Sequence, residues 1–103
     1  MKWTADVAVV GGGVIGTAVA YYLSRQGADV LLLEKDELGS GTSSACDGFV
    51  ILQSKSPGVH LQLGLASARI YRGLAAELDW DIEYNPCGGL IVIERPDELA
   101  AME

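Results

Sequence analysis

The chain has 103 residues, of which half are hydrophobic and a fifth are charged, and its formal net charge is −7. This composition is typical of a globular protein, and the excess of carboxylates argues against nucleic-acid binding through a general basic surface. The length suits one small domain or part of a larger one. With no signal peptide, no apolar run as long as a membrane span and no metal-ligand spacing of cysteines, we expect a cytoplasmic protein without a metal site. Peripheral association with a membrane stays open.

A strand, a helix and a second strand are predicted at the start of the chain. Residues 6–10, DVAVV, form a valine-rich run typical of a strand in a parallel sheet. Residues 14–26, VIGTAVAYYLSRQ, lack proline and predict a helix that Gly27 ends. Residues 29–34, DVLLLE, predict a second buried strand. This order indicates a βαβ unit with a right-handed crossover.

The glycines between the first strand and the helix have the spacing Gly11-x-Gly13-x-x-Gly16. The first permits a tight turn, the second lets a pyrophosphate approach the backbone, and the third lets helix and strand pack closely. The helix N-terminus then offers N–H groups and the positive end of its dipole to phosphates. Glu34 ends the second strand, where its carboxylate can accept hydrogen bonds from ribose hydroxyls and would repel the 2′-phosphate of NADP. Together these features predict a dinucleotide-binding site.

The segment after Glu34, KDELGSGTSSACDGFV, is dense in glycine, serine and threonine. It can return to the carboxyl end of the sheet, where such folds bind ligands, and its hydroxyls and N–H groups can surround a pyrophosphate. An ordinary polar connection would have a similar composition. The residues alone therefore leave both interpretations open, and the glycine spacing does not separate FAD from NAD.

Further along, a long helix and two short strands are expected. Ser56–Pro57 resembles an N-cap followed by proline in the first turn, and residues 58–78 are predicted to be helical. Apolar residues recur there at spacings of three and four, which predicts a face packed into the core. The members of this face are Leu63, Ala66, Ile70, Leu74 and Leu78. Residues 82–84 and 90–94 are predicted strands joined by the turn sequence NPCGG, and another helix is expected from Pro96.

The stretch DVAVVGGGVIGTAVAYYLSRQGADVLLLEK, followed by GSGTSSACDGFV, resembles the N-terminus of the D-amino-acid oxidase superfamily of FAD-dependent oxidoreductases. The likeness is greatest to the group of glycine oxidase, sarcosine oxidase and D-amino-acid or hydroxyproline dehydrogenase. It extends over ARIYRGLAAEL and CGGLIVIE. The resemblance implies FAD as the cofactor and a glycine oxidase-like enzyme that oxidises the CH–NH bond of a small amino acid or amine. The hydride would pass from the α-carbon to flavin N5.

The resemblance also implies positions for the cofactor-binding residues. Val14 and Ile15 lie at the pyrophosphate turn, Glu34 binds the adenosine ribose, and Lys35 lies beside the adenosine. The loop adds Gly41, Thr42 and Ser43, of which the last two contact the pyrophosphate, and Asp47, Gly48 and Phe49 near the isoalloxazine ring. Asp47 departs from the small residue common at its position, and a carboxylate there would disfavour the anionic reduced flavin unless it is turned away or paired. No catalytic residue is assigned.

The predicted fold is α/β. An incomplete Rossmann-like FAD-binding unit occupies residues 1–80, and residues 81–103 begin the sheet of a substrate domain. A single βαβ unit does not make a doubly wound domain, so we expect a longer protein whose missing C-terminal portion completes the sheet and holds the substrate. The fragment alone should be inactive.

Two other classes stay open. One is the cofactor domain of an NAD-dependent dehydrogenase with the same glycine spacing. The other is a non-catalytic nucleotide-binding subunit that acts through a partner chain, as a homo- or hetero-oligomer, because exposed apolar faces on a partial sheet favour association.

Overall fold

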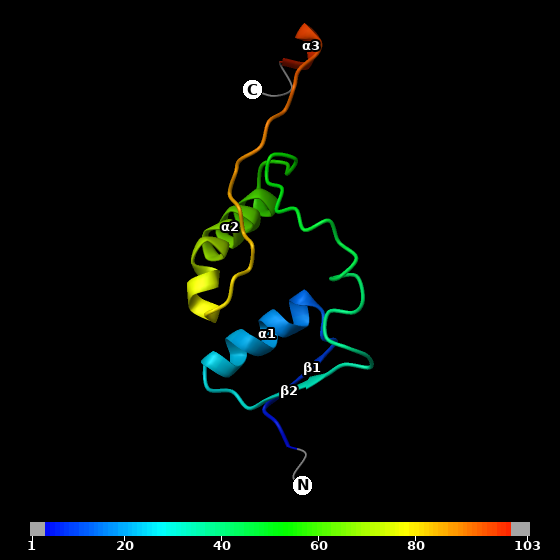
Figure 1. Cartoon of the computed structure of the whole chain (residues 1–103), viewed down its shortest axis with the longest axis vertical. Coiled ribbons are helices and arrows are strands. Elements are labelled where there is room, and N and C mark those ends of the chain that lie inside the picture. Colours follow the sequence, from blue (N-terminus) through cyan, green and yellow to red (C-terminus); the bar gives the residue numbers. More distant parts are fainter. Residues whose placement is uncertain (1–3, 100–103) are drawn as a thin grey trace. The chain divides into compact units, whose positions relative to one another are not determined.

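A computed structural model describes residues 4–99 (Figure 1). In chain order the elements are β1 (Val7–Val10), α1 (Val14–Arg25), β2 (Val30–Leu33), α2 (Val59–Leu78) and α3 (Pro96–Leu99). The chain divides into two compact units, Met1–Phe49 and Val50–Glu103. The first unit contains the predicted βαβ arrangement, and the second contains α2 and α3.

The strands of the first unit pair in parallel, with Val7 opposite Val30 and Val10 opposite Leu33. The connecting helix α1 contacts both strands. Gly11 extends the ladder, because its N–H donates to the Leu33 carbonyl oxygen over 2.8 Å. The predicted strand–helix–strand unit is confirmed, with each element ending within two residues of its expected bounds.

The two faces of this strand pair differ. Val7 and Val9 are half-buried and lie on the α1 side, where a Cβ added at Gly16 would lie 3.5 Å from Cγ1 of Val9. On the opposite face Val10 is 83% exposed and Leu33 is 45% exposed. Parallel strands are ordinarily covered on both faces. Within the described residues, therefore, one face of the pair is packed and the other is an apolar surface.

The end of α1 shows how glycine closes a helix. Gly27 has a φ of 89°, a conformation that L side chains rarely adopt. Its N–H donates to the Ser24 carbonyl oxygen over 3.0 Å, and the Ala28 N–H donates to the Leu23 carbonyl oxygen over 3.2 Å. These bonds satisfy carbonyl groups that the helix leaves without partners. The predicted role of Gly27 is confirmed.

In the second unit α2 begins later than the Ser56–Pro57 pattern predicted. Its N-cap is Gly58, with a φ of 121° and no hydrogen bond from a cap side chain. The glycine turns the chain between the proline and the helix, so the expected serine cap is wrong. At the other end Asp79 adopts the left-handed conformation with a φ of 50°, and the Trp80 N–H donates to the Ala75 carbonyl oxygen over 3.1 Å.

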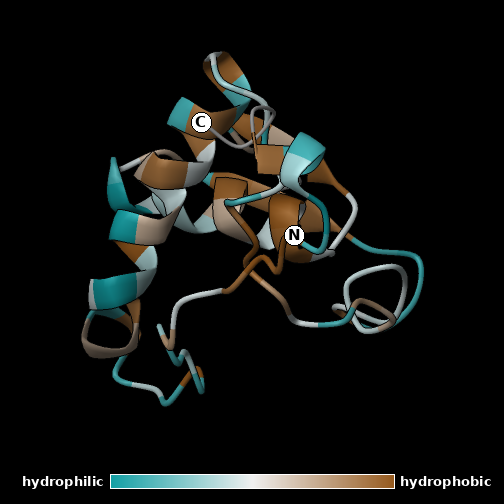
Figure 2. Cartoon of the chain, turned by 90° about the horizontal axis from the view of Figure 1, so that it is seen from above, coloured by the Kyte–Doolittle hydropathy of each residue, from teal (hydrophilic) through white to brown (hydrophobic). Residues whose placement is uncertain are grey.

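The apolar face predicted for α2 is not a core in this structure. Leu63 is 64% exposed, Ile70 is 49% exposed and Leu78 is 40% exposed; Ala66 is also exposed, and Leu74 alone of the five is half-buried. The segment after the helix instead contacts another side of it, where the rings of Tyr71 and Tyr84 lie 5.3 Å apart. Figure 2 shows hydrophobic and hydrophilic residues alternating around the helices. The spacing identified an amphipathic helix, but not which side the neighbouring segment would cover.

The expected strands at 82–84 and 90–94 are also absent from the described residues. This segment runs without regular structure to α3 (Figure 1), and Leu90 and Val92 are 85% and 72% exposed. A strand forms only when a second strand accepts its ladder of hydrogen bonds, and no such partner occurs among residues 4–99. The predicted helix start at Pro96 is confirmed, while residues 100–103 lie outside the described part of the chain. The boundary between residues 80 and 81 stays a prediction.

Among residues 4–99, no helix combines the length and the apolarity that crossing a bilayer requires.

Candidate functional site

The first and third glycines of the motif are required by the backbone itself. Gly11 has a φ of 105°, which glycine adopts without strain. A Cβ at Gly16 would overlap the carbonyl oxygen of Gly11 and lie 3.0 Å from its carbonyl carbon. The backbone conformation therefore requires glycine at position 11, and the close packing of the turn after β1 against the first turn of α1 requires it at position 16.

The second glycine makes room for the loop that follows β2. A Cβ at Gly13 would lie 3.0 Å from Oγ of Ser43. The same hydroxyl accepts a hydrogen bond from the Val14 N–H over 2.9 Å. The structure thus brings Gly13, Val14 and Ser43 together at the N-terminus of α1, where the helix dipole favours anions.

Glu34 lies just beyond β2 and is held by three backbone N–H groups. Its Oε2 accepts from Gly12 over 2.6 Å, and its Oε1 accepts from Lys35 over 2.8 Å and from Asp36 over 3.1 Å. These hydrogen bonds, the one from Gly12 most of all, lower the pKa of Glu34 below its usual value of 4.5. The carboxylate is therefore ionised at neutral pH and can act as a hydrogen-bond acceptor.

Gly12 was not among the predicted site residues, yet it joins the turn to the segment after β2. It is buried, and a Cβ at this position would lie 2.5 Å from Cδ2 of Leu38 and 3.1 Å from Cβ of Glu34. Its carbonyl oxygen accepts from the Gly39 N–H over 2.9 Å. The available signal was the run of three glycines, one more than the motif spacing needs.

Two other predicted loop residues take part through their carbonyl groups. The Ser44 hydroxyl donates to the Gly41 carbonyl oxygen over 3.0 Å, and the Ala45 N–H donates to the Thr42 carbonyl oxygen over 3.2 Å. These bonds fold the loop into a series of tight turns beside the glycine motif. Contacts of Gly41 and Thr42 with a pyrophosphate stay a prediction.

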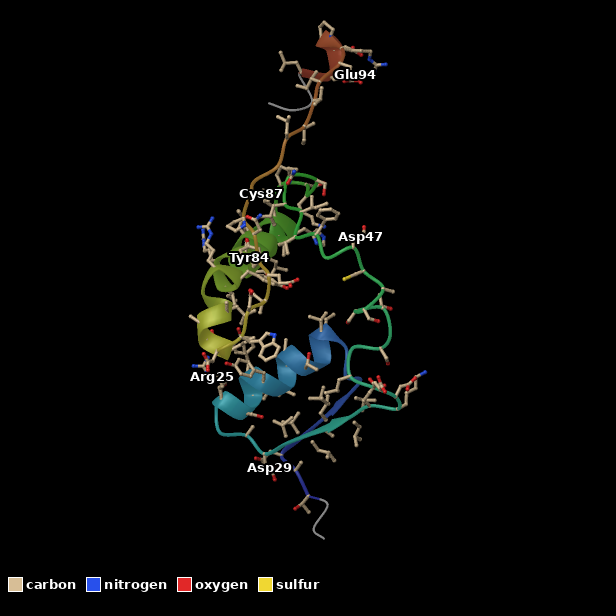
Figure 3. The ribbon with its side chains drawn as sticks, viewed as in Figure 1. Arg25, Asp29, Asp47, Tyr84, Cys87 and Glu94 are labelled. Atoms are coloured by element: carbon tan, nitrogen blue, oxygen red, sulfur yellow. The ribbon has the colours of Figure 1, made fainter. Side chains whose placement is uncertain are left out.

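The residues predicted near the flavin, Asp47, Gly48 and Phe49, are not gathered at the glycine turn, whereas Ile15 lies within the glycine motif and Lys35 directly follows Glu34. Phe49 is 77% exposed, and Figure 3 shows Asp47 on the loop away from β1, β2 and α1. Gly48, between these two residues, has a φ of 72°. Ile15 is 78% exposed on the first turn of α1, and the side chain of Lys35 is exposed. The predicted positions of Ile15 at the pyrophosphate, of Lys35 beside the adenosine and of the other three residues near the flavin stay predictions.

The assembled residues fit an adenine dinucleotide. Glycines leave the backbone open where a pyrophosphate would approach, the N-terminus of α1 supplies N–H donors, and the ionised Glu34 lies at the end of the adjacent strand. The three N–H groups that donate to Glu34 fix the position of its carboxylate at this edge of the sheet.

Comparison with known proteins agrees with this chemistry. The sequence profile of the family described as FAD dependent oxidoreductase matches residues 6–103. Glycine oxidase of Geobacillus kaustophilus (strain HTA426) is 44% identical over 77 residues, which is 71% of this chain and 20% of that enzyme. The 4-methylaminobutanoate oxidase (formaldehyde-forming) of Paenarthrobacter nicotinovorans is 39% identical over 95 residues, or 88% of this chain and 11% of that protein.

One relative is named as a regulatory subunit and not as an oxidase, and its alignment covers more of this chain. The mitochondrial pyruvate dehydrogenase phosphatase regulatory subunit of Mus musculus is 30% identical over 100 residues, which is 96% of this chain and 11% of that protein. The chain thus spans between 11% and 20% of the length of these three relatives.

Proposed function

Since the chain belongs to the family of FAD-dependent oxidoreductases, we propose that its protein oxidises the CH–NH bond of a small amino acid or amine. The observation that carries this proposal is the similarity to glycine oxidase and 4-methylaminobutanoate oxidase, which includes 71% and 88% of the chain. The names of both relatives describe oxidation of an amine-bearing carboxylic acid. Because proteins of this family use FAD, we favour a flavoenzyme over an NAD-dependent dehydrogenase.

In this proposal the described residues bind the adenosine diphosphate half of the cofactor. The N–H groups of the first turn of α1 and the hydroxyl of Ser43 face the pyrophosphate, and Glu34 accepts hydrogen bonds from the ribose. Gly41 and Thr42 line the same loop, and Lys35 follows Glu34 on the adenosine side. Bound FAD supplies the acceptor for the hydride of the substrate. Asp47, Gly48 and Phe49 lie further along the chain, toward the flavin end.

A direct test is anaerobic reduction of the flavin. The protein, expressed from its complete reading frame and loaded with FAD, is mixed with glycine, sarcosine, D-alanine, D-proline and N-methylated amino acids. Bleaching of the oxidised flavin bands by at least one of these compounds is expected, with a simple alcohol as the control substrate. Bleaching by alcohols but by no amine would refute the CH–NH assignment.

Cofactor choice is tested separately by titration calorimetry with FAD and with NAD. Binding of FAD that is lost in Glu34→Arg is expected, because the new cation removes the ribose acceptor and the N–H groups lose their partner. Binding of NAD with no binding of FAD would overturn the assignment of the site.

A second candidate function is a non-catalytic flavoprotein subunit that acts through a partner chain. The observation that favours it is the regulatory subunit of Mus musculus, which matches 96% of the chain. This second function predicts that the protein binds FAD, that no amine reduces the flavin, and that another protein co-purifies with it. The reduction experiment therefore separates the two candidates.

A further inference from the structure

Asp47 directly follows the part of the loop after β2 that hydrogen bonds hold in place. The Gly39 N–H donates to the Gly12 carbonyl oxygen over 2.9 Å, which joins the loop to the glycine turn. The Cys46 thiol donates to the Ser43 carbonyl oxygen over 3.2 Å, in the last turn of the loop. The chain is thus hydrogen-bonded up to the residue before Asp47, whose side chain is exposed on the loop (Figure 3).

No cation in the described part of its own unit balances the charge of Asp47. The cationic side chains of residues 4–49 are Arg25 and Lys35. The guanidinium carbon of Arg25 lies 5.7 Å from the centroid of a tyrosine ring on the same helix, and the charge of Lys35 acts on the adjacent carboxylate of Glu34. Among the described residues Asp47 takes part in no hydrogen bond and no ion pair through its side chain.

The expected place of Asp47 beside the flavin ring makes this unbalanced charge a functional question. A carboxylate there opposes the negative charge that the flavin gains when it is reduced. A cation next to Asp47 would offset this repulsion. Because the described residues of its unit provide no such cation, a substrate that carries one can provide it.

The amine that is oxidised is a poor partner for Asp47. Its nitrogen must be neutral when the α-hydride leaves, because the nitrogen lone pair forms the new C=N bond, and its N–H proton is then released to water. A neighbouring carboxylate favours the protonated ammonium and would therefore slow this step. A second cation that keeps its proton throughout avoids the conflict. A guanidinium is especially suitable, since it offers two parallel N–H donors to a carboxylate.

We propose that Asp47 selects substrates with a second cationic group: its carboxylate pairs with a guanidinium or ammonium group on the side chain of the substrate, away from the amine that is oxidised. This inference rests on the proposed amine oxidation and narrows its substrate class to basic amino acids and their N-substituted derivatives. Asp47 is thus a specificity-determining residue. Amino acids with neutral side chains bind more weakly, because they leave the charge of Asp47 unbalanced.

Arginine and citrulline are a matched pair of ligands for the test, because citrulline replaces the guanidinium with an uncharged urea group of nearly the same shape. Both enantiomers of each are mixed anaerobically with the full-length protein loaded with FAD. The change in the visible spectrum of the oxidised flavin gives the Kd of each ligand. Any bleaching that follows gives the rate of flavin reduction, so binding and oxidation are measured separately.

The same ligands are then compared in Asp47→Asn, with Glu37→Gln as the matched control variant. Glu37 is an exposed carboxylate of the same loop, and its carbonyl oxygen accepts from the Ser40 N–H over 3.2 Å, a bond that does not involve its side chain. Each variant thus removes one negative charge from the loop and replaces a carboxylate with an amide of the same shape.

We expect one enantiomer of arginine to bind the wild-type protein about ten- to a hundredfold more tightly than the same enantiomer of citrulline, the effect typical of hydrogen bonds between charged groups. Asp47→Asn should bring the two Kd values to within about threefold of each other, whereas Glu37→Gln should keep the wild-type difference. The rate of flavin reduction at saturating arginine should change less than the Kd, because Asp47 contacts the part of the substrate that does not react.

Equal binding of arginine and citrulline to the wild-type protein, or no binding of either, would overturn the inference, as would a preference for arginine that persists in Asp47→Asn. The comparison in the wild-type protein decides the question even if a variant does not fold. Failure of this inference is distinct from failure of the proposed function. Flavin reduction by glycine or sarcosine without a preference for arginine would leave amine oxidation in place, whereas preferential binding of arginine with no reduction by any amine would refute amine oxidation alone.

Discussion

Replacing Gly16 with alanine tests whether the third glycine is required by packing. Alanine in place of glycine ordinarily stabilises a helix by about 1 kcal/mol. At Gly16 the added methyl group would overlap the Gly11 carbonyl oxygen and lie 3.0 Å from its carbonyl carbon. Overpacking of this kind costs about 1–3 kcal/mol, and a backbone obstacle places it at the upper end. We expect the free energy of unfolding to fall by about 2 kcal/mol, which lowers the folding equilibrium constant roughly thirtyfold.

The matched control for this variant is Gly73→Ala. Gly73 lies within α2, and a Cβ there would meet no atom within 4 Å. The free energy of unfolding of Gly73→Ala should rise by up to about 1 kcal/mol, so the two substitutions should change stability in opposite directions. Urea unfolding of both apoproteins gives the free energies. A Gly16→Ala protein that is stabilised like Gly73→Ala would refute the packing argument.

Two further predictions concern charge. Because the folded-state pKa of Glu34 is lower than its usual value of 4.5, the ionised carboxylate stabilises the fold above about pH 4.5, and this contribution is lost as the pH falls through the lowered pKa. Glu34→Gln should therefore lose less stability than the wild type as the pH falls from about 7 to 3, as measured by urea unfolding midpoints. An equal loss of stability in both proteins would contradict the argument that three N–H groups stabilise the ionised carboxylate. The predicted placement of Asp47 near the flavin ring implies that Asp47→Asn raises the midpoint potential of the bound flavin by about 20 mV, since a carboxylate near the ring opposes the anionic reduced state. Potentiometric titration measures this change, and an unchanged potential would show that Asp47 lies away from the ring in the loaded protein.

The glycine turn shows which parts of the structure local sequence can specify. Gly11 and Gly27 mark places where the backbone needs a positive φ, and that requirement depends on a few neighbouring residues. The valine- and leucine-rich runs predict strands, and the residues between them predict a helix, because these patterns reflect short-range periodicity. Glu34 could be placed for the same reason, since it directly follows the second strand.

Other features depend on residues far apart in the chain. The bond from Val14 to Ser43 and the packing of Leu38 on Gly12 require the loop after β2 to return to the turn, and no local pattern encodes its path. The segment after α2 covers the side of the helix on which Tyr71 contacts Tyr84. The amphipathic spacing of the helix does not predict which side this segment covers.

The strands expected at 82–84 and 90–94 show the same limit most clearly. Their residues have the composition of strands, but a strand exists only in a ladder with a partner, and the described residues provide none. The sequence by itself thus determined the βαβ unit, the glycine turn and the acid that follows β2. The tertiary structure decided which side chains meet at the N-terminus of α1 and which apolar segments lack a partner, because pairing depends on where distant parts of the chain lie.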